Sequence, residues 1–229
     1  MDTQRSSGYR DGLGSDPSVS GGNLAAQLVG YSSRCPLLDW VSPAFALNVS
    51  MTIWNGVQMI LRLSQEMKTK IKAGKLVEIP LDSNPYVDWS FDLFNDGRRD
   101  YIIMMNTASF FSCVFSAWRI TSVSTLLSPA KETIGGYLAD DGKQFVFSKY
   151  IAPSFSAGRF AKPLSHSASE SMNDLVDVAK TLLAHGMGLH EIAYQLNKAP
   201  MSALVGPDGR RNVCPKEAFA SLADRIVEK

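Results

Sequence analysis

Three apolar segments in the middle of the chain are separated by short polar stretches. The segments cover residues 87–94, 101–105 and 110–118 and are rich in aromatic and β-branched side chains, as strands are. The stretches between them, at residues 95–97 and 106–109, contain the turn formers Asn, Asp, Gly and Ser. Because connections this short join antiparallel neighbours, the pattern predicts a three-stranded antiparallel meander.

The first of these segments alternates strictly between large apolar and small polar side chains. Trp89, Phe91 and Leu93 alternate with Ser90 and Asp92. Successive side chains of a strand point to opposite faces of its sheet. We therefore expect one face of this strand to be buried and the other to be solvated.

Shorter elements are expected before and after the meander. Residues 60–63 predict a strand, and Ser64 predicts the N-cap of a short helix to about residue 73. Ser128 and Pro129 are typical of a helix start, and that helix should end near residue 139.

Residues 144–150 alternate Phe145 and Phe147 with polar neighbours, which predicts another strand. Residues 155–162 could pair with it across the bend at residues 152–154.

The last third of the chain is predicted to be helical. Apolar residues recur at helical spacing over residues 172–183 and 189–196, and Pro215 opens a final helix. Strands followed by helices, without regular βαβ alternation, predict an α+β fold. We expect an antiparallel sheet that contains the meander, helices packed on one side of it, and a single domain over residues 59–229.

The first 58 residues differ from the rest in composition. Residues 1–23 are rich in Ser, Gly and Asp and contain almost no large apolar side chains, so they cannot bury enough surface to offset the entropy of ordering. Residues 24–58 are more apolar but show no sustained period. We expect residues 1–58 to be a disordered or a non-native extension, with translation from Met59 as one hypothesis and a genuine flexible tail as the alternative.

The charge balance bears on the class of partner. The chain has 23 Lys and Arg against 22 Asp and Glu, a net charge of +1, which argues against a dedicated polyanion binder but leaves room for a local basic patch. No apolar run approaches the roughly 20 residues that span a bilayer, and the first residues do not resemble a secretory signal. We expect a soluble, cytoplasmic protein without membrane contact.

Few residues are spaced for catalysis or for metal binding. Cys35, Cys113 and Cys214 are widely separated, and Cys113 lies in an apolar run, where a thiol behaves as a core residue. His185 and His190 are five residues apart and do not share a helix face, as an i, i+4 metal pair would. The sequence therefore predicts no metal and no cofactor, and it favours a protein that is not an enzyme.

Four residues are candidates for binding an anion. Arg98 and Arg99 lie at the tip of the predicted hairpin, although exposed arginines near turns are common. His166 and Asn173 lie in a polar segment at a predicted helix start, where free backbone N–H groups suit an anion. The alternative for that segment is a capped helix entry with a solvated linker.

Several short motifs, taken in order, resemble one family. They are Asp88-Trp89-Ser90, the strand and turn at 101–107, Asp140-Asp141-Gly142, Ile151-Ala152-Pro153 with Arg159-Phe160-Ala161-Lys162, Ser171-Met172-Asn173-Asp174, and the stretch 196–204. Over about residues 59–223 the chain is similar to small bacterial proteins grouped only as a domain of unknown function. Such proteins tend to have Asn-Arg-Ser where this chain has Ser165-His166-Ser167. If that arginine binds an anion in them, the resemblance implies that His166 would do so weakly and in a pH-dependent way here. The resemblance implies no activity and carries over no catalytic residue.

Three functions follow as expectations. The first is a non-enzymatic binding or interaction protein, in a mobile-element or stress-related context, whose protein partner adds a strand at a sheet edge. The second is a small enzyme acting on a phosphate-bearing substrate, which requires Arg98, Arg99, His166 and Asn173 to converge. The third is weak nucleic-acid binding through the lysines at residues 68–75, although the pattern favours a solvated helix face for these lysines.

Overall fold

A five-stranded mixed sheet forms the centre of the computed structural model, which describes residues 58–206 and 208–224. Its strands, in chain order, are β1 (Met59–Leu63), β2 (Asp88–Asp96), β3 (Arg99–Asn106), β4 (Ser112–Ser116) and β5 (Gly158–Ala161). They are arranged as β4-β3-β2-β1-β5. All of these strands belong to one compact unit.

The predicted meander makes up one half of this sheet. β2, β3 and β4 are antiparallel neighbours in sequence order, whereas β1 runs parallel to both β2 and β5. The prediction of a wholly antiparallel sheet is therefore wrong. The segment between β1 and β2 is long enough for the crossover that a parallel pair requires.

Six helices and a hairpin complete the described part of the chain. The helices are α2 (Gln65–Lys70), α3 (Val123–Asp140), α4 (Gln144–Val146), α5 (His166–Ala184), α6 (Leu189–Lys198) and α7 (Pro215–Ala220). Single helical turns occur at Pro85–Val87, Phe147–Ile151, Ala152–Ser156 and Ser221–Ala223. The hairpin, β6 (Met201–Val205) with β7 (Arg211–Val213), interrupts the predicted helical third, which is confirmed only in part.

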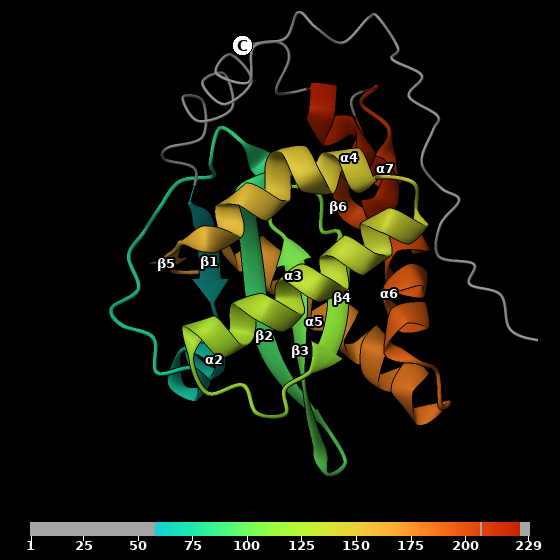
Figure 1. The fold of residues 1–229 in the computed structure, drawn as a ribbon. Coiled ribbons are helices and arrows are strands. Elements are labelled where there is room, and N and C mark those ends of the chain that lie inside the picture. Colours follow the sequence, from blue (N-terminus) through green and yellow to red (C-terminus); the bar gives the residue numbers. More distant parts are fainter. Residues whose placement is uncertain (1–57, 207, 225–229) are drawn as a thin grey trace, which may run out of the picture. The chain divides into compact units, whose positions relative to one another are not determined.

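Helices cover both faces of the sheet, which corrects the prediction that they lie on one side (Figure 1). α3 packs on the face that carries Trp89 and Met104, and α5 packs on the face that carries Ile103 and Met105. The reason lies in β3, whose residues 101–105 are apolar without alternation. A strand with two apolar faces must be covered on both.

Two further predictions about local structure are wrong. Residues 144–150 are helical, because Val146, Phe147, Tyr150 and Ile151 face the core at helical spacing. Phe145, one of the two aromatic residues that suggested a strand, is 68% exposed. β5 consequently pairs with β1, and not with residues 144–150.

The helix expected from Ser128 begins several residues earlier. Ser122 is the N-cap of α3, and it forms a capping box with Thr125. Pro129, which suggested the start, lies inside the helix. By contrast, Ser64 caps α2 as predicted and accepts a hydrogen bond from the Met67 amide.

The expectations for residues 1–58 fall almost wholly outside the described residues. Within residues 58–206 and 208–224, no helix combines the length and the hydropathy needed to cross a bilayer.

Candidate functional site

A shallow groove lies where the β2–β3 hairpin meets the loop that follows β4. Its volume is about 590 Å³. The lining residues come from the end of α2, the hairpin tip, and the loop: Lys70, Arg98, Arg99, Asp100, Ser116, Ala117, Trp118, Arg119, Ile120 and Thr121. We call this the basic groove.

The backbone around the basic groove is fixed by turns. Gly97 has a φ of 62° in the two-residue connection of the hairpin, a conformation that glycine adopts without steric cost. The Ala117 amide donates to the Asp100 carbonyl at 3.0 Å, and the Ile120 amide donates to the Ala117 carbonyl at 3.3 Å. These bonds tie the loop to the hairpin and place Trp118 and Arg119 at its tip.

Trp118 is the most unusual residue of the basic groove, because its side chain is 72% exposed. The guanidinium carbon of Arg119 lies 4.0 Å from the indole ring centroid, which is cation–π geometry. Trp89, on β2, is instead fully buried. Trp and Arg are both enriched where proteins contact their partners, so this adjacent pair marks the loop tip as a candidate contact surface.

Positive charge dominates the basic groove. Among the described residues, no carboxylate lies within ion-pair distance of Arg98, Arg99 or Arg119. The Lys70 ammonium is 3.0 Å from a carboxylate oxygen of Asp100.

Asp100 carries the negative charge of the basic groove. A hydrogen bond from the Asn95 amide at 3.1 Å, and then Lys70, hold the pKa of Asp100 below its ordinary value. The carboxylate is therefore ionised at neutral pH and neutralises Lys70, so three arginines remain for an anion.

The structure does not bring together the four residues predicted to bind an anion. Arg98 and Arg99 also line a second hollow with Leu183 and Gly186, at the C-terminal end of α5. His166 is the first residue of α5. A helix of 19 residues extends about 28 Å at 1.5 Å per residue, so the arginines and His166 lie near opposite ends of this helix.

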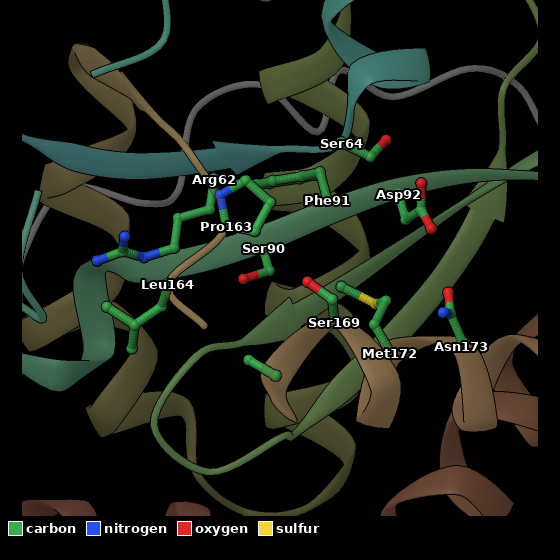
Figure 2. A pocket seen from close by; sticks show the side chains of 11 residues that line it. Arg62, Ser64, Ser90, Phe91, Asp92, Pro163, Leu164, Ser169, Met172 and Asn173 are labelled. Carbon is green, nitrogen blue, oxygen red and sulfur yellow. The ribbon is translucent and has the colours of Figure 1, made fainter. Parts of the chain in front are cut away.

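His166 and Asn173 have separate surroundings. The His166 side chain is 88% exposed, and its Nδ1 is 3.2 Å from a carboxylate oxygen of Glu170. Asn173 lines a small cavity together with Asp92 (Figure 2). The convergent site that a phosphate-processing enzyme requires is therefore not formed by these residues, and anion binding by each of them stays a prediction.

Of the predicted lysine cluster, Lys70 alone lines the basic groove. Its ion pair with Asp100 turns it toward the hairpin. Lys70 is two residues from both Lys68 and Lys72 and therefore does not share a helix face with them, so it reaches the groove that Arg98 and Arg99 line.

Both edges of the sheet are partly covered by the chain itself. On β4, the Asn197 side chain accepts from the Ser112 amide at 2.7 Å and donates to the Ser112 carbonyl at 2.8 Å. Beside β5, the Val77 carbonyl accepts from the Lys162 amide at 2.9 Å. Addition of a partner strand stays a prediction, but fewer backbone groups are open to it than the sequence suggested.

Cys113 is fully buried, as the apolar run predicted, and burial raises the pKa of its thiol to about 12. Such a thiol is a poor nucleophile, because the reactive form is the thiolate. Sequence reasoning instead missed Trp118 and Arg119, because it assigned Trp118 to the strand. β4 ends at Ser116, and a Trp followed by Arg directly after a strand was the available signal.

Comparison with known proteins gives a family but no activity. A family model described as "Domain of unknown function (DUF6933)" matches residues 60–218, which is more than half of the chain, so the chain belongs to this family. The match confirms the resemblance found in the sequence, over slightly narrower bounds. No curated protein matches the sequence.

Proposed function

We propose that this member of the DUF6933 family is a non-enzymatic binding protein that holds single-stranded nucleic acid in the basic groove. The observation that carries the proposal is the exposed Trp118 next to three arginines without carboxylate partners among the described residues. Single-stranded nucleic acids bind to surfaces that combine stacking aromatic side chains with cations along the backbone.

The geometry of the basic groove suits this ligand in two respects. The Trp118 indole and the Arg119 guanidinium both offer flat surfaces on which a base can stack. Arg98 and Arg99, at the hairpin tip on the same groove, can bind phosphate oxygens through paired N–H donors. Since the net charge of the whole chain is only +1, we expect modest affinity and little long-range attraction.

The test is fluorescence anisotropy of a labelled single strand of about 12 nucleotides, titrated with the full chain at several salt concentrations. With one phosphate each on Arg98, Arg99 and the N–H edge of Arg119, the logarithm of the affinity should fall with the logarithm of salt at a slope of about −2. Trp118→Ala should weaken binding roughly 5- to 150-fold, which corresponds to about 1–3 kcal/mol for one stacked base. The double variant Arg98→Ala/Arg99→Ala should flatten the slope by about 1.4.

A matched control exists elsewhere on the surface. Phe145 is 68% exposed, and the Lys149 ammonium lies 5.2 Å from its ring centroid, so this pair resembles Trp118 and Arg119 in kind. The variant Phe145→Ala/Lys149→Ala should bind like the unmodified chain. The proposal would be contradicted if Phe145→Ala/Lys149→Ala lost as much affinity as Trp118→Ala. It would also be contradicted if the unmodified chain did not bind at low salt.

A further inference from the structure

A second candidate site, independent of the basic groove, lies under the first two turns of α5. It is a cavity of about 180 Å³ between β1, β2 and α5, bordered by Pro163 and Leu164 (Figure 2). We call this the α5 cavity.

The α5 cavity exists because small polar residues replace large apolar ones on half of one sheet face. Ser90 and Asp92 of β2 lie beside Met105 and Ile103 of β3 on the face that α5 covers. Over β3 the side chains are large enough to fill the space below the helix. Over β2 they are not, and α5 presents the small Ala168 above them. The alternation that predicted a solvated face thus produces a partly covered polar cavity.

Arg62 borders the α5 cavity but provides no charge for a ligand. Its N–H donors are used on the chain itself, two on the carboxylate of Asp88 at 2.7 Å each and three on the carbonyl oxygens of Ile79, Pro80 and Lys162. Asp88 neutralises the guanidinium. The α5 cavity therefore has no available cation at the Arg62 end.

The opposite end of the α5 cavity carries a carboxylate and an amide. Figure 2 shows Asp92 and Asn173 at that end, away from the Arg62 guanidinium. One oxygen of Asp92 accepts from the Leu93 amide at 2.8 Å, which leaves the second oxygen open. Within the described part of the chain, no hydrogen-bond partner reaches the Asn173 amide and no cation pairs with Asp92.

Charged side chains on neighbouring elements leave the Asp92 end of the α5 cavity negative. Glu66 and Lys180 line the hollow that adjoins Asp92 and Asn173, and the Lys180 ammonium is 4.0 Å from Asp177. With Lys180 facing Asp177, the end of the α5 cavity at Asp92 is negative. The remaining wall combines the apolar side chains of Leu164 and Met172 with three serines, Ser64, Ser90 and Ser169.

We propose that the α5 cavity binds a small organic cation, a primary ammonium group on an apolar body of about six to eight non-hydrogen atoms. The ammonium group donates to the open oxygen of Asp92 and to the carbonyl oxygen of Asn173, and the apolar body lies against Leu164 and Met172. The size follows from the volume, since an apolar cavity of about 150 Å³ holds benzene. A charge-assisted hydrogen bond to a half-buried carboxylate supplies the preference for a cation.

The experiment measures binding of three size-matched probes to the full chain by protein-observed NMR or calorimetry. Benzylamine should bind, benzyl alcohol should bind at least about 10-fold more weakly, and benzoate should show no saturable binding, because it places a second negative charge beside Asp92. Asp92→Asn, which keeps the shape of the side chain, should weaken benzylamine binding about 10-fold or more. Asp174→Asn, at an exposed carboxylate of α5 that lines neither the α5 cavity nor the adjoining hollow, is the matched control and should leave binding unchanged.

A second variant keeps the test decisive if Asp92→Asn disturbs folding. Asn173→Asp, at an exposed position, adds a carboxylate to the same end and should tighten benzylamine binding about 3- to 10-fold. The proposal is overturned if benzoate binds as tightly as benzylamine. It is also overturned if neither variant changes benzylamine binding, or if benzylamine fails to bind at about 10 mM.

Discussion

Arginine occurs in two contrasting settings in this domain. Arg62 is 1% exposed, and its N–H donors are bonded to the chain. Arg98 and Arg99 lie at an exposed hairpin tip without a carboxylate partner among the described residues. The buried guanidinium joins β1 to the segment at residues 79–80 and to Lys162, whereas the exposed ones are available to a ligand. The bonding of the donors, more than the residue type, separates a structural charge from a functional one.

The largest effect on stability is expected at the buried arginine, Arg62. Arg62→Met should lower the free energy of unfolding by about 3–5 kcal/mol, because it leaves the carboxylate of Asp88 buried without a partner. Urea denaturation measures the loss, and Arg159→Met, an exposed arginine on the neighbouring strand β5, is the matched control with little effect.

Two results would break this side of the comparison. The first is an Arg62→Met variant as stable as the Arg159→Met control. The second is a folded Arg62→Met variant with altered oligonucleotide binding, since Arg62 is not part of the basic groove. The double variant Arg62→Met/Asp88→Asn should lose less stability than the sum of the single variants, because the two residues share one network.

An intermediate effect is expected at Asp141, which is 11% exposed and lies between Lys143 and Lys216. Burial raises the pKa of Asp141, but its bonds to the two lysines outweigh burial and leave the pKa lowered. A lowered folded-state pKa stabilises the fold above the unfolded value of about 3.9, and that stability is lost as the pH falls through the folded value.

Asp141→Asn should therefore cost about 1–2 kcal/mol at neutral pH and progressively less below about pH 4. Unfolding free energies of both proteins between about pH 7 and pH 2 measure the difference. A constant difference across this range would show that the side chain contributes through packing alone, and Asp141 would then not rank between the buried and the exposed pairs.

Sequence patterns predicted the local elements of this domain better than they predicted contacts between distant segments. Strict alternation in β2 and the turn formers around it located the meander, and Ser64 located the start of α2. The parallel pairing of β1 with β5 could not be predicted, because it joins segments far apart in the chain through backbone groups that any sequence provides. The covered second face could have been inferred from the continuous apolar run in β3.

In the candidate sites, too, the sequence predicts the separate local features but not the contacts between distant segments. Arg98, Arg99 and Lys70 were found as separate signals, because each occurs in a recognisable turn or helix. They line one groove with Trp118 because of the turn at residues 117–120, where the Ala117 amide donates to the Asp100 carbonyl. The α5 cavity depends on which residues α5 places above Ser90 and Asp92, and no pattern within either segment reports on the other.

The smallest effect is expected at the exposed ion pair of Lys70 with Asp100. Asp100→Asn removes the negative charge of the basic groove and releases Lys70, so the affinity for a single-stranded oligonucleotide should rise about 2- to 4-fold at low salt. The unfolding midpoint should hardly move, since a solvated pair adds little stability. Asp208→Asn, in the turn between β6 and β7 and likewise beside an arginine, Arg210, is the matched control and should not change the affinity.

Salt separates a charge effect at Asp100 from a direct contact. Because screening weakens interactions between exposed charges, the gain in affinity from Asp100→Asn should shrink as salt is added. A gain that persists at about 0.5 M salt would mean that the introduced amide side chain contacts the oligonucleotide directly. An equal gain in the Asp208→Asn control would remove the basic groove as the binding site, because of these two carboxylates only Asp100 lines that groove.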